Sequence, residues 1–371
     1  MLRKFKVSNF KCFEEDFVLD LSKVNGYTFN PECVKNGIVN CAMIYGYNGM
    51  GKSNLGFAIF DIIEHLTDTN RSEIPYNNYL NAYSKSPTAN FYYEFFINGK
   101  IVKYEYKKTD YRTLVFERLS IDDIELVLFD RSNDENHFEV KLKGSETLNK
   151  TINDNKLSVL KYIKNNTTLE NNEYNKTFID FFTFIERMLY FRSLENRTYM
   201  GLENGTKTIT EYIIEQDKVQ DFEDFLNKAN LKCKLSVVEG VNRKELVYNF
   251  NGKQILMYEI SSTGTSVLTL FYFWFLRIKE AGVSFLFIDE FDAFYHHELS
   301  KMVVEKLKST GVQFVLTTHN TAILTNDLLR PDCYFLMNKK RIQSLSQSTE
   351  KELREAHNIE KMYKAGAFDV E

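Results

Sequence analysis

The sequence has few of the features that mark secreted proteins, proteins with structural metal sites, or membrane proteins. Its five cysteines show no CxxC or other metal-binding spacing, which favours free thiols in a reducing compartment. The longest apolar run, Val267 to Leu276, is far shorter than a membrane-spanning helix. The first residues pass directly into an alternating strand pattern and lack the apolar core of a signal peptide. We therefore expect a soluble, cytoplasmic protein with no membrane partner.

An excess of positive charge and long repeats are also missing. The 47 Lys and Arg residues face 51 Asp and Glu residues, so the formal net charge is −4. That balance argues against a large surface that binds nucleic acid non-specifically, although a local basic patch could still exist. No internal repeat is visible, and no heptad pattern is sustained, which excludes a long coiled coil. The 371 residues, 43% of them hydrophobic, suffice for one large domain or two smaller ones.

What the sequence does contain is a phosphate-binding loop between a strand and a helix. Residues 46–53 read GYNGMGKS, after a mostly apolar segment 38–45 and before a helix-period apolar pattern that reaches Leu66. The glycines let backbone N–H groups surround phosphate oxygens, and the helix N-terminus adds the positive end of its dipole. Lys52 can neutralise the β and γ phosphates, and Ser53 can hold Mg²⁺. The context of strand, loop and helix predicts a nucleoside triphosphate site.

Two later apolar segments end in polar residues suited to the same chemistry. The apolar segment 283–288 is followed by Asp289, which can hold Mg²⁺ directly or through water, and by Glu290, which can polarise an attacking water. The segment 313–318 is followed by His319, whose imidazole can donate a hydrogen bond to a γ-phosphate. Alone, the acids could mark a charged turn and the histidine a structural residue. The P-loop upstream, and the single strand–helix–strand unit between them, favour a catalytic interpretation.

The order of these motifs resembles that of ATP-binding-cassette (ABC) ATPases. A serine- and glycine-containing turn, Ser261 to Thr265, lies between the P-loop and the acids and leads into an apolar helical segment, 267–278. Such a turn can be an ordinary helix cap or an anion site. In the family, this turn binds the γ-phosphate held by the opposite subunit. The resemblance therefore implies that Ser262 and Gly264 act on ATP bound to a second copy, in a homodimer or a higher homo-oligomer.

Short motifs place the resemblance in the SMC, RecF and OLD branch rather than with transporters. They are NFKCF at 9–13, GYNGMGKSN at 46–54, DEFDAFYH at 289–296 and TTHN at 317–320. The tail, 357–366, resembles short RloA- and AriA-like ATPase subunits of bacterial phage-defence operons. The resemblance covers essentially the whole chain. It implies nucleotide contacts from Asn48, Gly49, Gly51, Lys52, Ser53, Asn54 and Lys11, a Mg²⁺ site at Ser53 and Asp289, and catalytic roles for Glu290 and His319.

The sequence departs from the family pattern in several places. Members usually have a Gln that contacts Mg²⁺, but no Gln occurs between Lys52 and Gln216; Glu117 is a candidate substitute, or the contact is missing. The turn lacks the usual double glycine, which implies slow or conditional hydrolysis. Too few residues follow His319 for a Toprim nuclease domain, so any cleavage of nucleic acid would belong to a separate protein. Residues 338–341 (NKKR) lack the Asp that pairs with guanine, which favours ATP over GTP.

The expected fold is α/β: a P-loop NTPase with the head of an ABC ATPase, a mixed β-sheet core, an N-terminal antiparallel β subdomain and an inserted helical lobe. We expect one head over 1–371. It divides into a P-loop lobe with β-hairpins (1–144), a mostly helical insertion (145–260), and a lobe with the signature turn, acids, histidine and tail (261–371). The patterns predict helices over 176–192 and 209–228, strands over 114–121 and 124–130, and hairpin turns at Asn98-Gly99 and Asn251-Gly252.

Three functions fit these observations. The favoured one is an ATPase, a dimer or larger scaffold, that senses phage and controls a separate effector such as a nuclease. A DNA-repair or recombination ATPase of RecF or SMC type is the alternative; it would need a basic face or long coiled-coil arms. A non-catalytic ATP-binding module is the third, and the intact Glu290 counts against it.

Overall fold

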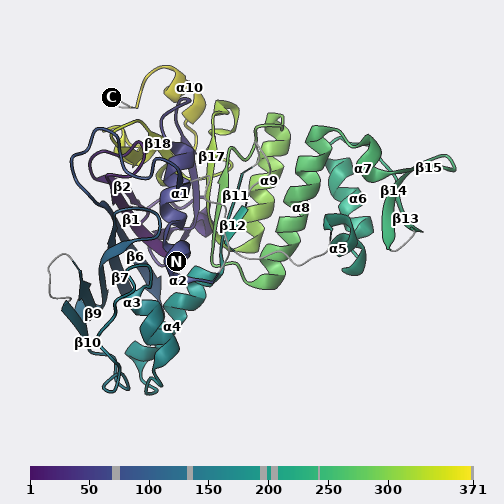
Figure 1. The fold of residues 1–371 in the computed structure, drawn as a ribbon. Coiled ribbons are helices and arrows are strands. Elements are labelled where there is room, and N and C mark those ends of the chain that lie inside the picture. The colour runs from purple at the N-terminus through teal and green to yellow at the C-terminus, as the bar shows by residue number, and fades with distance from the viewer. Residues whose placement is uncertain (69–75, 132–136, 193–198, 202–207, 241–242, 369–371) are drawn as a thin grey trace.

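The chain folds around a mixed sheet whose central strands are parallel. The computed structural model describes residues 1–68, 76–131, 137–192, 199–201, 208–240 and 243–368 (Figure 1). The sheet order is β12 (Tyr199–Gly201), β11 (Met188–Arg192), β16 (Phe285–Asp289), β17 (Gln313–Thr318), β5 (Cys41–Tyr45), β18 (Tyr334–Met337) and β19 (Ile342–Ser344). Only the two edge strands are antiparallel to their neighbours. Strands β5, β16, β17 and β18 are buried throughout, which explains why the sequence shows continuous apolar runs there.

A second sheet of seven strands is wholly antiparallel. Its order is β10 (His137–Val140), β9 (Ile124–Asp130), β8 (Leu114–Ile121), β7 (Lys100–Lys108), β6 (Ala89–Ile97), β1 (Leu2–Ser8) and β2 (Phe17–Asp20). Along β1 and β7, buried and partly exposed residues alternate, as expected of a sheet with one face on the core. Asn98 and Gly99 have φ of 53° and 77°, the conformation of a tight hairpin turn. The predicted strands at 114–121 and 124–130 are confirmed.

The helices link these sheets and extend the main one. Helices α1 (Lys52–Phe60) and α2 (Ile62–Leu66) follow the P-loop, and α3 (Val159–Asn166) and α4 (Glu173–Glu186) lie beside the antiparallel sheet (Figure 1). Helices α8 (Thr263–Ala281) and α9 (His297–Thr310) flank β16, and α10 (Ile359–Lys364) lies near the C-terminus. The short strands β3 (Val34–Lys35) and β4 (Ile38–Val39) form a hairpin before β5.

Residues 208–240 and 243–260 form the end of the molecule farthest from the antiparallel sheet (Figure 1). They contain α5 (Ile209–Glu215), α6 (Val219–Lys228) and α7 (Met257–Ile260). A three-stranded sheet lies among them: β13 (Leu235–Glu239), β14 (Lys244–Phe250) and β15 (Lys253–Leu256). The single helix predicted over 209–228 is wrong, because Asp217 adopts a φ of 53° and separates α5 from α6. The helix predicted over 176–192 is also wrong at its end, since residues 188–192 form strand β11 beside β16.

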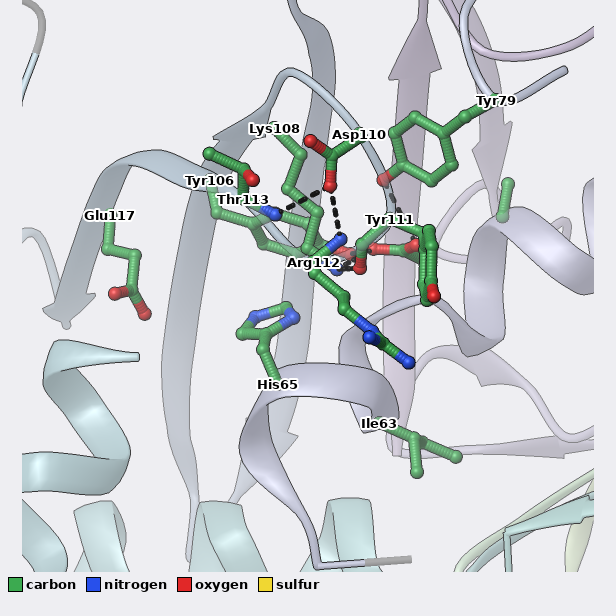
Figure 2. Close-up of polar contacts among 12 residues, drawn as sticks. Ile63, His65, Tyr79, Tyr106, Lys108, Asp110, Tyr111, Arg112, Thr113 and Glu117 are labelled. Carbon is green, nitrogen blue, oxygen red and sulfur yellow. Dashed lines mark hydrogen bonds and ion pairs between the residues drawn. The ribbon is translucent and has the colours of Figure 1, made fainter. Parts of the chain in front are cut away.

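A buried polar network joins the P-loop helix to the antiparallel sheet. Asp61, at the junction of α1 and α2, forms an ion pair of 2.7 Å with Lys108 of β7, and neither side chain is exposed. The hydroxyl groups of Tyr79 and Tyr106 donate to the two carboxylate oxygens of Asp61 at 3.0 and 2.9 Å. Figure 2 labels Lys108, Tyr79 and Tyr106 together with Ile63 and His65 of α2. The network compensates two charges that would otherwise be costly to bury.

Replacing Lys108 by Met is expected to lower the free energy of unfolding by about 3–5 kcal/mol, because Asp61 would remain as an uncompensated buried charge. Urea unfolding followed by circular dichroism measures this loss. The matched control is Lys6→Met, which removes a solvent-exposed ion pair with Asp16 and should change stability by less than about 1 kcal/mol. Equal effects of the two substitutions would contradict the role assigned to the network.

Candidate functional site

The P-loop bends where only glycine fits. Strand β5 ends at Tyr45, and α1 begins at Lys52 after Gly51, whose φ is 97°. A Cβ atom at Gly51 would lie 2.6 Å from the Cys12 sulfur, and one at Gly46 would lie 2.7 Å from the carbonyl oxygen of Met337. The backbone carbonyl leaves no room for a side chain at Gly46, and the φ of Gly51 favours glycine, so the motif is fixed by backbone geometry as well as by chemistry.

Lys52 turns back over the loop. Its Nζ atom donates to the carbonyl oxygens of Gly46 and Tyr47 at 2.8 and 3.3 Å and lies 2.8 Å from Nε2 of His319. Burial, and then the Lys52 charge, lower the pKa of His319, so a neutral imidazole accepts this hydrogen bond. Burial also lowers the pKa of Lys52, while Asp289 and Glu290 act in the opposite direction. The ammonium group is therefore held among neutral acceptors in a setting that favours an anionic ligand.

The two acids stand at the end of β16, opposite the P-loop helix. Asp289 is fully buried, and its Oδ1 atom accepts a hydrogen bond of 2.7 Å from the Thr317 hydroxyl. Thr317 Oγ1 in turn accepts from the backbone N–H of Glu290 at 2.7 Å. Glu290 has a φ of 49°, a left-handed conformation that costs a non-glycine residue energy and recurs at functional sites. Burial, and then Asp289, raise the pKa of Glu290, which makes it a better proton acceptor than an ordinary glutamate.

One cavity brings most of the predicted residues together. It measures about 240 Å³ and is lined by Asn48, Gly49, Gly51, Lys52, Ser53, Asn54, Glu290 and His319. These residues come from the P-loop and from the ends of two strands, β16 and β17. The carboxyl ends of parallel strands are where open α/β sheets bind ligands.

Lys11 lies in a neighbouring cavity of about 580 Å³, which also reaches Gly49 of the P-loop. Its Nζ atom donates to the carbonyl oxygen of Asn77 at 3.0 Å, and burial lowers its pKa. Lys339, Lys340 and the exposed ring of Tyr83 line the same cavity. Lys11 is thus adjacent to the P-loop cavity, where a nucleotide could extend, but it does not line it.

Ser262 and Gly264 lie apart from both cavities. Ser262 is the exposed N-cap residue of α8, and its Oγ atom accepts from the backbone N–H of Thr265 at 3.2 Å. Gly264 faces the carbonyl oxygen of Phe294, in the turn after the acids. In Figure 1, α9 lies between α8 and α1. A single chain therefore does not bring the turn at Ser262 to Lys52.

Sequence reasoning missed several residues of the site. Arg192, at the end of β11, lies 3.3 Å from Asp289 Oδ2 through Nε and 3.6 Å from Glu290 Oε2 through a terminal nitrogen. Thr318 donates to both carboxylate oxygens of Asp292 at 2.7 and 2.9 Å, which ties the turn after Glu290 to β17. The threonine pair before His319 was a visible signal. Arg192 had none, because its segment was predicted to be helical.

Glu117 does not replace the missing glutamine. It lies on β8 of the antiparallel sheet and is fully buried. Its carboxylate accepts from the Tyr104 hydroxyl at 2.8 Å, from the Ser158 hydroxyl at 2.6 Å and from the Val159 backbone N–H at 2.7 Å (Figure 2 shows Glu117). These bonds cap the start of α3, and burial raises the pKa of the carboxyl group. Its role as a metal contact is therefore corrected: Glu117 is a structural residue.

The chemistry of Ser53 and Asp289 suits a hard divalent cation, although Ser53 lines the P-loop cavity and Asp289 lies one residue before Glu290, which lines it. Asp289 Oδ2 is buried and accepts no hydrogen bond of good geometry within the described residues. Hydroxyl and carboxylate oxygens are ligands that Mg²⁺ prefers, and it commonly takes its remaining ligands from phosphates and water. Across the described part of the chain, no three His, Cys, Asp or Glu side chains cluster so as to hold a metal by themselves. The donor set therefore fits Mg²⁺ that arrives with a nucleotide.

None of the helices in the described ranges is both long and apolar enough to span a membrane. No curated protein matches the sequence significantly. Solved structures of SMC head domains do match. The Smc head with an extended coiled coil, bound to the C-terminal domain of ScpA and derived from Pyrococcus furiosus, has a TM-score of 0.50 and 13% identity. The match covers 93% of this chain and 97% of that one.

Two further SMC head structures are similar. A SmcHead bound to the C-winged helix domain of ScpA gives a TM-score of 0.48 at 16% identity over 93% and 98% of the two chains. The SMC head domain from Thermotoga maritima gives 0.44 at 14% over 92% and 98%. The fold is thus that of an ABC-type ATPase head, as expected. A family model described as "AAA domain, putative AbiEii toxin, Type IV TA system" matches residues 41–325, which is most of the chain, so this protein belongs to that family of AAA-domain proteins.

Proposed function

We propose that this protein binds ATP with Mg²⁺ and hydrolyses it. The observation that carries the proposal is the cavity that joins the P-loop to Glu290 and His319. Lys52 and the P-loop backbone would hold the phosphates, and Ser53 and Asp289 would hold Mg²⁺. Lys11 and the cavity it lines would accommodate the rest of the nucleotide. Mg²⁺, when bound, would neutralise charge on the phosphate oxygens.

Glu290 would act as the general base. Its side chain lines the cavity, and its raised pKa suits it to accept a proton from water. His319 would sense the γ-phosphate. Its neutral imidazole already accepts a hydrogen bond from Lys52, so the ring would have to exchange that partner when a phosphate binds.

We propose further that the working site lies between two copies. Ser262 is exposed at the start of α8, where backbone N–H groups and the helix dipole favour an anion. Large apolar side chains are exposed near the elements that would meet: Tyr47 on the P-loop, Phe294 after the acids, and Tyr258 and Ile260 before Ser262. Exposed aromatic residues of this kind are typical of contact surfaces. A second copy would place its Ser262 and Gly264 against the γ-phosphate held by the first.

Ser262→Asp is expected to prevent ATP-dependent pairing, because its charge would face the γ-phosphate across the interface. Ser262→Asn is the control, since both residues keep the N-cap of α8 and differ in charge. The Asp variant should weaken pairing by at least about tenfold, whereas the Asn variant should pair like the wild type. Light scattering during size exclusion with ATP measures the difference. Pairing of both variants would contradict the composite site.

We propose that nucleotide-driven pairing controls a separate effector, such as a nuclease or toxin, in antiphage defence. The description of the matched family, which names a toxin and a type IV toxin–antitoxin system, supports this reading. The net charge of −4 supports it over action on DNA. Copurification from the native host with and without ATP, followed by mass spectrometry, tests it. We expect a partner whose recovery depends on nucleotide; stimulation of turnover by DNA alone would favour the repair alternative instead.

A further inference from the structure

Arg192 stands beside the two acids because of the register of the main sheet. Strand β11 pairs in parallel with β16, and Arg192 is the residue opposite Asp289. Side chains two residues apart on a strand share a face, so Tyr190 and Arg192 share one face of β11, and Phe287 and Asp289 share one face of β16. A Cβ atom at Gly56 of α1 would lie 2.7 Å from the Tyr190 ring and 2.9 Å from the Phe287 ring. That face is the one covered by the P-loop helix.

The guanidinium group compensates both acids in the protein without nucleotide. Its Nε atom lies 3.3 Å from Oδ2 of Asp289, and a terminal nitrogen lies 3.6 Å from Oε2 of Glu290. The Asp289 side chain is fully buried, and those of Arg192 and Glu290 are about 22% and 19% exposed. Two neighbouring carboxylates in such a setting need a cation nearby.

Oδ2 of Asp289, the oxygen next to Arg192, is also the one that a metal ion would need. Asp289 Oδ1 accepts from the Thr317 hydroxyl at 2.7 Å, whereas Oδ2 accepts no hydrogen bond of good geometry from the residues that the structure describes. Arg192 Nε lies 3.3 Å from that oxygen, at an ion-pair distance rather than in a well-directed hydrogen bond. Two cations, a guanidinium group and Mg²⁺, would repel each other across one carboxylate oxygen.

We propose that Arg192 is a positioning residue that competes with Mg²⁺ for the Asp289 carboxylate. In the absence of nucleotide, the guanidinium group acts as the counter-cation of Asp289 and Glu290 and opposes binding of metal alone. When Mg²⁺ arrives with the phosphates, Arg192 releases Oδ2 and remains near Glu290. This inference rests on the proposed function, in which Asp289 is a metal ligand.

The test measures metal binding without turnover. In Arg192→Met, which keeps the aliphatic length and removes the charge, Mg²⁺ alone should raise the thermal unfolding midpoint. Half of that rise should require about fivefold less Mg²⁺ than in the wild type, the factor that corresponds to about 1 kcal/mol for one ion pair. The Mg²⁺ concentration needed for binding of a fluorescent ATP analogue should shift in the same direction. Arg192→Gln, which keeps hydrogen-bond donors but no charge, should behave like the Met variant and serves if that variant does not fold.

Two controls separate charge from packing. Arg192→Lys keeps the charge and should retain most of the wild-type Mg²⁺ dependence. Arg118→Met removes an arginine that pairs with Glu105 and Glu125 on the antiparallel sheet and should change nothing in the metal titration. An unchanged Mg²⁺ dependence in both uncharged variants would overturn the inference. So would loss of nucleotide binding at saturating Mg²⁺, which would make Arg192 a ligand of the nucleotide.

The proposed function can fail separately. If the wild-type protein bound no ATP, the metal titration would still report whether Arg192 competes at Asp289. If ATP bound normally and the titration showed no shift, only the role of Arg192 would fall.

Discussion

Replacing Glu290 by Gln should slow ATP turnover by about 10²–10⁴-fold while leaving ATP binding intact, the loss expected when a positioned general base is removed. Glutamine keeps the size and position of the side chain but cannot take the proton. The ATP-bound, paired form should therefore accumulate. Phosphate release and size-exclusion light scattering measure the two effects on the same sample.

The pH dependence supplies a second readout of Glu290. Because burial and Asp289 raise its pKa above the ordinary value, turnover should rise with pH as the carboxyl group loses its proton. That acid limb should disappear in the Gln variant. Glu298→Gln, on the exposed side of α9, is the matched control and should not alter turnover. Turnover unchanged in Glu290→Gln would show that another group is the base.

Replacing Lys52 by Ala should weaken ATP binding by at least about thirtyfold, because truncating one partner of a buried charge pair costs about 2–5 kcal/mol. Lys52 is buried, and within the P-loop cavity it contacts backbone carbonyls and His319. A phosphate would give its ammonium group a far stronger partner. Isothermal titration with ATP and Mg²⁺ measures the loss.

The control for Lys52 is Lys6→Ala, on the exposed side of the antiparallel sheet, which should bind ATP like the wild type. Circular dichroism should show that both variants fold. An Ala variant at Lys52 with wild-type affinity would refute the assignment of the P-loop as a phosphate site.

The motifs that sequence reasoning located best are local. The P-loop lies within one strand–loop–helix unit, so its geometry follows from the glycine positions and from the apolar pattern on either side. The acids and His319 each end a strand that is buried on both faces, and such strands are visible as apolar runs. The order of these units resembles that of ABC ATPases, and this resemblance predicts the fold class.

The features that the sequence did not reveal depend on contacts between distant segments. Residues 178–189 are rich in large apolar side chains throughout, and this pattern does not show where α4 ends and β11 begins. The strand exists because it pairs with β16, and that pairing places Arg192 opposite Asp289. Glu117 looked available as a metal ligand because composition cannot show that its carboxylate caps a helix about 40 residues later in the chain.

The P-loop unit is inserted between two strands of the antiparallel sheet, β2 and β6, and this bears on how the protein can be divided or recombined. The chain leaves that sheet after β2, builds β5, the P-loop, α1 and α2, and returns as β6, which pairs directly with β1. The strands before and after this unit, β2 and β6, both pair with β1. The ion pair between Asp61 and Lys108 also joins the helices of the unit to β7. The antiparallel sheet is therefore not a detachable module. A chimaera that exchanges it between relatives should carry α1 and α2 with it, so that Asp61 and Lys108 come from the same parent.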